Sequence, residues 1–223
     1  MQIEKIRIKE LKIFTKPSFR ENGEGLRLAI NSKWQDNPNL HGHDENGKSL
    51  FRLPPVRYIP YENPVLVATE AGFAELENIY DSIGEKLRVY SNEYKIIASE
   101  IKDREYDFGT DDELHSYRSI SPWFALNSKC YDEYMRHGSF EKKSQLLQKV
   151  LVGNMLSLAK GLDIWVKEKL FVKIDSFDEV KLQLKGNPFL AFKANFTGNI
   201  ILSDKLGIGK HVSLGFGRFA GND

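Results

Sequence analysis

The 223-residue chain is predicted to have an α+β fold with two lobes. Strand-like and helix-like hydrophobic patterns follow one another over residues 1–101 in the order strand, helix, strand, strand, helix, strand, which is the ferredoxin-like order. An acidic, glycine-containing stretch at residues 103–112 then separates this half from a second run of strand and helix patterns. We therefore expect domains at residues 1–108 and 113–223.

The first strand is predicted at residues 1–14, where isoleucine and leucine alternate with charged side chains. Pro17 ends it, because proline cannot donate to a strand ladder. Residues 18–34 carry apolar side chains at roughly helical spacing, so we expect a first helix there, interrupted by Gly23 and Gly25.

In the rest of the first lobe, prolines and a glycine indicate where the strands and the helix end. Residues 51–61 and 63–69 are extended segments broken by prolines, and residues 72–83 form an amphipathic helix that ends at Gly84. A last strand is expected at residues 87–101. An antiparallel sheet in this order is a common RNA-binding platform, although the order alone is weak support for that function.

The second lobe is predicted to begin with a strand at residues 114–126. Residues 142–166 have the strongest helical periodicity in the chain, and we assign their apolar face to core packing. Trp123 and Trp165 lie in apolar contexts and are expected in the core. Four short strands follow, separated by turn signals, at residues 170–174, 180–184, 189–196 and 200–202.

Composition limits the function classes only loosely. The net charge of +1 and pI near 7.8 lack the strongly basic balance of many nucleic-acid-binding proteins, but phosphate binding depends on where cations cluster. The single cysteine, Cys130, excludes a disulfide framework within the chain and a multi-cysteine zinc site. We expect a cytoplasmic protein with no membrane association, since no apolar stretch approaches the length of a bilayer span.

A glycine-rich segment, LGIGKHVSLGFGRF, occupies residues 206–219. It does not fit a dinucleotide or Walker loop, because those need a helix after the glycines and only residues 220–223 follow the segment. The spacing does allow main-chain amides to approach a sugar-phosphate backbone. The alternative is a tight hairpin whose glycines serve turns.

Four segments together resemble one protein family. The glycine-rich segment is similar to that of the CRISPR-associated repeat-processing endoribonucleases, within the repeat-associated RNA-binding superfamily. Residues 40–58 (LHGHDENGKSLFRLPPVRY), 121–127 (SPWFALN) and 151–162 (LVGNMLSLAKGL) resemble the histidine-rich b subtype of that family. The resemblance implies two tandem ferredoxin-like (RRM-like) lobes with a C-terminal glycine-rich loop. It also implies cofactor-free, metal-independent cleavage of precursor CRISPR RNA within repeats, leaving 2′,3′-cyclic phosphate and 5′-hydroxyl ends.

Cleavage of RNA without a metal needs a base for the 2′-hydroxyl, an acid for the 5′-oxygen and donors for the phosphorane. Imidazole suits the first two tasks, because its pKa of about 6.5 leaves both protonation states populated near neutrality. His41 and His43 flank Gly42, and residues two apart in an extended chain project to the same side. The resemblance gives this pair the catalytic role, with base and acid unassigned. Histidines without a role, or a metal pair with Asp44 and Glu45, remain alternatives.

Charge stabilisation is assigned just downstream, to Lys48, Arg52, Arg57 and Tyr58. Tyr58 is the best candidate of the four and is predicted to be catalytic. The family usually has a lysine after this tyrosine and a tyrosine before the first proline, whereas this chain has Ile59 and Leu53. Either Lys48 or Arg57 substitutes, or the enzyme is slow or inactive.

The remaining predicted contacts are with RNA. His115 and His137 are assigned no role. The expected partners are single-stranded or hairpin CRISPR repeat RNA and CRISPR effector subunits, with a homodimer left open. Two alternatives compete: a non-catalytic RNA-binding protein that retains the crRNA or builds a surveillance complex, and a ferredoxin-like regulatory domain unrelated to RNA. Predicted RNA-binding residues besides Lys48, Arg52 and Arg57 are Lys160, Gly207, Gly209, Lys210, His211, Gly215, Gly217 and Arg218.

Overall fold

The computed structural model describes residues 1–32, 34, 53–184 and 186–221. The chain forms two compact units. The N-terminal unit consists of Ile6–Tyr106 and Ser213–Gly215, and the C-terminal unit of Met1–Lys5, Asp107–Val212 and Phe216–Asp223. Among the described residues, no helix is both long enough and apolar enough to cross a membrane.

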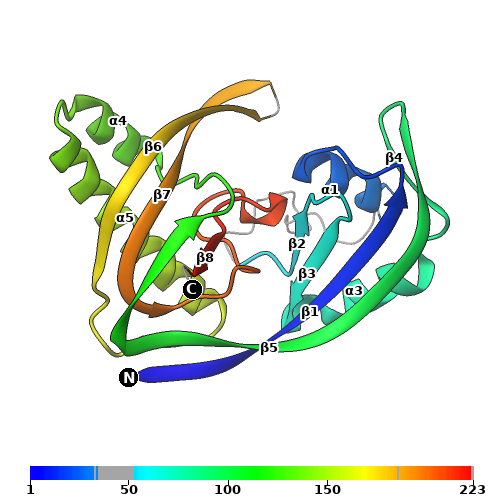
Figure 1. The fold of residues 1–223 in the computed structure, drawn as a ribbon, viewed down its shortest axis with the longest axis horizontal. Coiled ribbons are helices and arrows are strands. Elements are labelled where there is room, and N and C mark those ends of the chain that lie inside the picture. The colour runs from blue at the N-terminus through cyan, green and yellow to red at the C-terminus, as the bar shows by residue number, and fades with distance from the viewer. Residues whose placement is uncertain (33, 35–52, 185, 222–223) are drawn as a thin grey trace, which may run out of the picture. The chain divides into compact units, whose positions relative to one another are not determined.

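The N-terminal unit has the predicted ferredoxin-like order (Figure 1). Its sheet is arranged β2-β3-β1-β5, with β3 antiparallel to both β1 and β2. The elements are β1 (Gln2–Lys16), α1 (Gly23–Asn31), β2 (Val56–Ile59), β3 (Val65–Thr69), the 3-10 helix η1 (Glu70–Gly72), α3 (Phe73–Ser82), β4 (Lys86–Val89) and the first part of β5 (Asn92–Ser119).

One predicted strand, at residues 87–101, is instead a hairpin. β4 turns back at Tyr90, whose φ of 52° is in the left-handed region, and Val89 pairs with Asn92 at the start of β5. The fourth strand of the ferredoxin-like sheet, which pairs with β1, is therefore β5 and not β4.

Helix α1 begins five residues later than predicted, at Gly23. Asn22 caps it by accepting a hydrogen bond from the Gly25 amide at 2.9 Å. A Cβ on Gly25 would lie 2.9 Å from the Cβ of Glu21 and 3.1 Å from Val89. The glycines therefore do not interrupt the helix. They allow its first turn to pack closely against neighbouring residues such as Glu21 and Val89.

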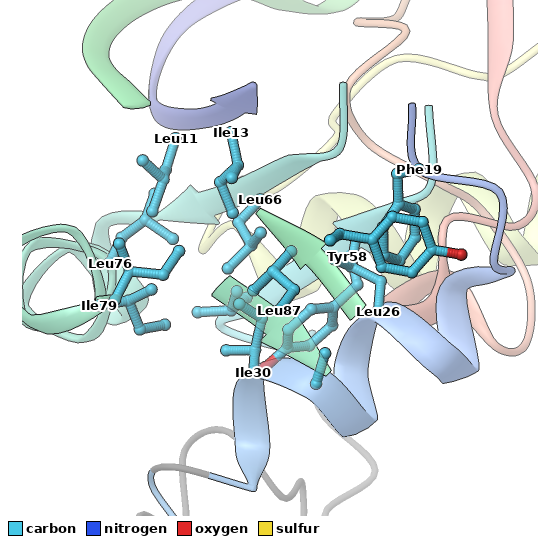
Figure 2. Close-up of a cluster of buried hydrophobic side chains, with 14 of the residues drawn as sticks. Leu11, Ile13, Phe19, Leu26, Ile30, Tyr58, Leu66, Leu76, Ile79 and Leu87 are labelled. Atoms are coloured by element: carbon cyan, nitrogen blue, oxygen red, sulfur yellow. The ribbon is translucent and has the colours of Figure 1, made fainter. Parts of the chain in front are cut away.

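The core of this unit lies between the sheet and its two helices (Figure 2). Alternate residues of β1 point into it, as the period-2 pattern predicts. Figure 2 shows these side chains converging with those of α1 and α3. The labelled members are Leu11, Ile13, Phe19, Leu26, Ile30, Tyr58, Leu66, Leu76, Ile79 and Leu87, all buried.

The C-terminal unit is built on the second part of β5. Its other elements are α4 (Ser128–Arg136), α5 (Phe140–Gly161), β6 (Val172–Leu184), β7 (Asn187–Ile201) and β8 (Phe219–Gly221), with the 3-10 helix η2 at Val212–Leu214. β7 pairs with β6 and β5, and β8 pairs with β5, all antiparallel. The four predicted short strands are two long ones, because the ladder continues past a β-bulge between Ile174 and Ser176.

The acidic stretch predicted as a boundary is strand rather than linker. It lies within β5, and its carboxylates are paired: Asp107 with Lys5 at 2.7 Å, and Asp103 with Lys9 at 3.2 Å. The two units do divide inside this stretch, between Tyr106 and Asp107. Cross-strand ion pairs thus allow a charged segment to form a continuous strand.

Helix α5 runs from Phe140 to Gly161, shorter at its end than the predicted 142–166. Ser139 caps its start by accepting from the Lys142 amide at 3.3 Å. Beyond its end, Asp163 has a φ of 58°, which stops the helix. The predicted apolar face is buried, with Leu147, Leu151 and Met155 all inaccessible.

The order of elements in the C-terminal unit is strand, helices, strand, strand, irregular segment, strand. The sheet order β8-β5-β7-β6 matches β5-β1-β3-β2 in the N-terminal unit. The glycine-rich segment stands where a ferredoxin-like unit has its second helix. The predicted α+β class with two ferredoxin-like lobes is confirmed.

Candidate nucleic-acid interface

The predicted catalytic histidines belong to the N-terminal unit by their place in the chain. His41, His43, Lys48 and Arg52 lie outside the described residues. In the sequence they stand between α1 and β2. Their roles stay predictions.

Tyr58 is described, and its phenol lies in the core of the N-terminal unit. It is 1% exposed and donates a hydrogen bond to Oδ1 of Asn31 at 2.8 Å. Burial raises the pKa of this phenol far above its usual value. The catalytic role of Tyr58 stays a prediction, and it requires the phenol to exchange Asn31 for a phosphate.

Arg57 is the neighbour of Tyr58 on β2 and points to the opposite face of the sheet. It is 1% exposed, and none of its guanidinium nitrogens has a hydrogen-bond partner among the described residues. Desolvation lowers its pKa to about 10. An unpaired buried guanidinium is costly, and binding an anion offsets that cost.

The glycine-rich segment is fastened to the C-terminal unit by main-chain hydrogen bonds. The Ile208 amide donates to Gly217 and the Gly217 amide to Pro122, both at 2.9 Å. The Lys210 amide donates to Phe124 at 3.1 Å, forming a β-bridge beside β7. The segment is therefore an ordered part of the sheet's edge.

Its glycines are required by contacts within the chain. A Cβ on Gly217 would meet the Ile208 carbonyl oxygen, and a Cβ on Gly207 that of Phe216. At Gly209 it would lie 2.8 Å from the Trp123 indole nitrogen, and at Gly215 it would lie 2.9 Å from the Tyr58 carbonyl oxygen. These glycines shape the segment, and contact of their amides with RNA stays a prediction.

The cations of the segment differ in exposure. Arg218 is 4% exposed; its Nε donates to the Asp204 carbonyl at 2.8 Å, and its amide donates to the Ser121 hydroxyl at 2.9 Å. Lys210 is exposed, and His211 beside it is half-buried. Lys160 is exposed on the last turn of α5. Lys210 is thus the one exposed residue of the segment, and His211 is among its half-buried residues.

An aromatic cluster beneath this segment was missed by sequence reasoning. Phe124, within the SPWFALN stretch, contacts His211 at a ring distance of 4.9 Å, Phe216 at 4.8 Å and Phe189 at 6.0 Å. Periodicity places Phe189 in a strand but carries no signal that this strand begins beside the glycine-rich segment.

The two tryptophans assigned to the core differ. Trp123 is fully buried and donates from its indole nitrogen to Asn154 at 3.0 Å, as expected of a core residue. Trp165 is 80% exposed, so that assignment is wrong. Helix α5 ends at Gly161, before Trp165, and the tryptophan does not share the helix's buried face.

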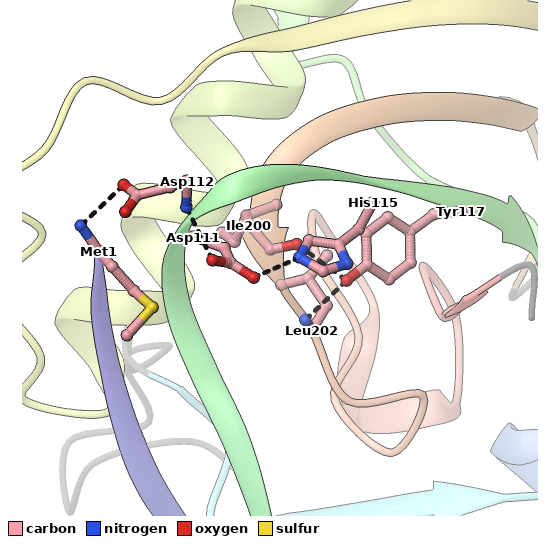
Figure 3. A network of polar contacts seen from close by, with 7 residues as sticks. All are labelled: Met1, Asp111, Asp112, His115, Tyr117, Ile200 and Leu202. Atoms are coloured by element: carbon pink, nitrogen blue, oxygen red, sulfur yellow. Dashed lines mark hydrogen bonds and ion pairs between the residues drawn. The ribbon is translucent and has the colours of Figure 1, made fainter.

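A polar network lies at the bulge of β5 in the C-terminal unit (Figure 3). Nε2 of His115 is 2.8 Å from the Asp111 carboxylate, and this bond holds the pKa of Asp111 below its usual value. The amino group of Met1 pairs with Asp112 at 3.1 Å, and the Tyr117 hydroxyl donates to the Ile200 carbonyl at 2.8 Å. Among the described residues, no three His, Cys, Asp or Glu side chains gather as a metal site requires.

Two ferredoxin-like units and an ordered glycine-rich segment define a class of folds that solved structures share. A structure described as "Crystal structure of Cas6b" superposes with a TM-score of 0.84 at 27% identity, covering 97% of this chain and 100% of that chain. A second, of the "CRISPR RNA processing endoribonuclease Cas6b", gives a TM-score of 0.73 at 25% identity over 97% and 100%.

The sequence places the chain within that class. The Cas6b N-terminal domain matches residues 4–107, and the Cas6b C-terminal domain matches residues 109–220. The chain belongs to the Cas6b family of CRISPR repeat-processing endoribonucleases. An uncharacterized protein of Methanocaldococcus jannaschii is 39% identical over 132 residues, 59% of this chain and 89% of that protein.

Proposed function

We propose that this protein cuts precursor CRISPR RNA once within each repeat, without a metal ion, and leaves 2′,3′-cyclic phosphate and 5′-hydroxyl ends. The observation that carries the proposal is the match of both Cas6b domains, at residues 4–107 and 109–220. The structure named as a CRISPR RNA processing endoribonuclease, similar over 97% of this chain, supports it.

The reaction is a transesterification in which one phosphorus–oxygen bond forms and another breaks. A base takes the proton of the 2′-hydroxyl, and the 2′-oxygen attacks the adjacent phosphorus. The bond to the 5′-oxygen then breaks, and an acid gives that oxygen a proton. We assign base and acid to His41 and His43, in either order.

Negative charge grows on the phosphate during this step and needs a cation or donors close by. We assign it to Arg57, because its buried guanidinium has no partner among the described residues. Lys48 and Arg52 are the further candidates. Tyr58 is the candidate donor of a hydrogen bond, on the condition that its phenol leaves Asn31.

RNA is held, in this proposal, by the glycine-rich segment. Lys210 and His211 contact the strand, together with amides at Gly209 and its neighbours, because Lys210 is exposed and Gly209 and His211 are half-buried. Gly207, Gly215, Gly217 and Arg218 act by shaping the segment, as their contacts within the chain indicate. Lys160 adds charge from the end of α5.

The test is cleavage of the repeat RNA from the CRISPR array of the same genome, in EDTA, by the wild type and by His41→Ala, His43→Ala and the double variant. We expect cleavage that survives chelation, cyclic-phosphate ends, and loss of cleavage in the double variant. Cleavage that stops in EDTA, or persists in the double variant, contradicts the mechanism.

A second function is favoured by one departure from the family pattern. Ile59 and Pro60 stand where the family usually has a lysine after the tyrosine, so charge stabilisation is weakened. In that case the protein binds repeat RNA without cutting it and retains the product or joins a surveillance complex. Tight binding by the wild type with no cleavage of any repeat distinguishes this function from the first.

A further inference from the structure

Phe189 lies beside the glycine-rich segment with part of its ring exposed. It meets Phe124 at 6.0 Å and 75°, and His211 at 5.7 Å and 72°, both edge-to-face. Phe124 itself is 3% exposed, whereas Phe189 is 38% exposed. The ring is therefore held in place from below and keeps surface for another aromatic partner.

The strand explains why this phenylalanine is exposed. β7 has three phenylalanines, of which Phe192 and Phe196 lie on one face of the strand and are fully buried. Phe192 packs there against Tyr134 of α4 at 5.2 Å. Phe189 lies an odd number of residues away and so points to the opposite face, since the register of β6 and β7 is unbroken between Ser176 and Leu184.

The face that Phe189 shares is polar further along the strand. Lys193 and Asn195 are exposed on it, and Arg118 of β5 lies beside Asn195 in the ladder. Neither Lys193 nor Arg118 has an ion-pair partner among the described residues. The carboxylates on this face belong to β6. Asp178 is opposite Lys193 in the ladder, and Asp175 accepts a hydrogen bond from the Thr197 hydroxyl.

The spacing fits an extended nucleic-acid strand. Phe189 and Lys193 are four positions apart, which is about 13 Å along a β-strand. Proteins hold a single strand by combining an exposed aromatic ring with nearby cations: a base stacks on the ring, and phosphates meet the charges. No hydrogen-bonding pattern for a particular base is needed.

We infer that Phe189, supported by His211 and Phe124, is a stacking shelf for one unpaired base of the bound RNA, and that Lys193 and Arg118 hold the phosphates next to it. The inference rests on the proposed RNA-binding function. It adds a residue, Phe189, and a second surface, the open face of β5 and β7, to the glycine-rich segment.

The first test measures binding of fluorescein-labelled repeat RNA that carries 2′-deoxyribose at the cleaved nucleotide. Phe189→Ala and Phe189→Leu are expected to raise Kd roughly 5- to 150-fold, the loss typical of one stacked base, and Phe189→Trp to restore binding. Phe171→Ala removes a 52%-exposed phenylalanine of the same unit and serves as the matched control. We expect its Kd to equal that of the wild type.

A second test separates stacking from mere support of the fold. Each nucleotide of the RNA is replaced in turn by an abasic residue. One position is expected to raise the wild-type Kd by the same factor as Phe189→Leu and to have no further effect in that variant. The fluorescence of 2-aminopurine at this position should be quenched by the wild type and recover with Phe189→Leu.

Equal Kd values for Phe189→Leu and the wild type, or the lack of any coupled position, overturn the shelf while leaving RNA cleavage intact. Failure of the wild type to bind any repeat RNA overturns the proposed function and, with it, the shelf. The two failures are thus distinguishable in one set of measurements.

Discussion

Helix α3 of the N-terminal unit and the glycine-rich segment, all but Ser213–Gly215 of which belongs to the C-terminal unit, occupy the same place in the order of elements. α3 satisfies its main chain internally and buries Leu76 and Ile79. The glycine-rich segment bonds its main chain to neighbouring segments and leaves Lys210 and part of His211 accessible. One fold thus serves two purposes: a regular helix completes a core, and an irregular segment presents polar groups.

The largest expected effect separates chemistry in the N-terminal unit from RNA binding in the C-terminal unit. His41→Ala or His43→Ala should lower the cleavage rate at saturating protein by about 10²–10⁴-fold, the usual contribution of a general acid or base, with little change in Kd. Lys210→Ala should raise Kd and leave that saturated rate unchanged. Single-turnover cleavage over a range of protein concentrations gives both quantities.

The reverse result, a rate loss at saturation for Lys210→Ala with unchanged Kd, contradicts the division of labour. Phe171→Ala is the matched control for an exposed substitution in the C-terminal unit.

The next largest effect is on the free energy of unfolding, because the backbone of the glycine-rich segment is closely packed. Gly217 has a φ of 69°, and a Cβ there would meet the Ile208 carbonyl. Gly217→Ala should destabilise the protein by roughly 2–5 kcal/mol, from the left-handed backbone and from the clash. Gly153 lies inside α5 with nothing within 4 Å of the same atom, so Gly153→Ala should stabilise by about 1 kcal/mol.

Urea unfolding of both variants checks this pair. A Gly217→Ala protein as stable as the wild type would show that the segment rearranges freely, and its proposed role as a fixed surface for RNA would then be wrong.

The sheets of the two units can be compared through one arginine in each, Arg57 on β2 and Arg118 on β5. Arg57 is buried without a partner among the described residues, whereas Arg118 is exposed. Arg57→Met should therefore stabilise the free protein by roughly 1–4 kcal/mol, as when other buried charges are replaced by apolar residues. Arg118→Met should change stability by less than about 0.5 kcal/mol.

Both arginine variants should bind repeat RNA more weakly, for different reasons: one loses a cation at the reacting phosphate, and the other a cation on the open sheet face. Stability is read from urea midpoints and binding from fluorescence anisotropy. If Arg57→Met destabilised the protein, the packing of the arginine's methylene groups would stabilise the fold by more than its buried charge destabilises it.

The sequence predicted the elements whose periodicity is long and regular. The alternation in residues 1–14 became β1, and the helical face of 142–166 became α5. It failed where tertiary contacts decide the conformation. The acidic stretch at 103–112 does contain the division between the two units, but it is strand, because Lys5 and Lys9 on the neighbouring strand pair with its carboxylates.

The candidate site was predictable in composition but not in geometry. The motif in 206–219 identified Lys210 and His211, which are accessible, but it could not show that Arg218 is turned inward to Asp204. Phe189 was missed because its role depends on the β-bridge between Phe124 and Lys210, which joins segments far apart in sequence. No local pattern records such a contact.

The smallest expected effect lies in β5, the strand that passes through both units. In its C-terminal part the bond from His115 lowers the pKa of Asp111 from its ordinary value of 3.8. A carboxyl group with a lowered pKa in the folded state stabilises that state above pH 3.8, and this contribution is lost as the pH falls through the lowered value. Asp111→Asn should thus be less stable than the wild type at neutral pH, and the difference should vanish in strong acid.

A double-mutant cycle assigns the effect to this pair, because His115→Ala should abolish the pH-dependent difference between Asp111 and its asparagine variant. Urea midpoints measured from neutrality to below pH 3.8 give the four curves of the cycle. A difference that persists in the His115→Ala background would mean that the amides of Asp112 and Glu113, and not the imidazole, hold the Asp111 carboxylate. The bulge between β5 and β7 would then be stabilised by its own turn, without a contribution from the histidine.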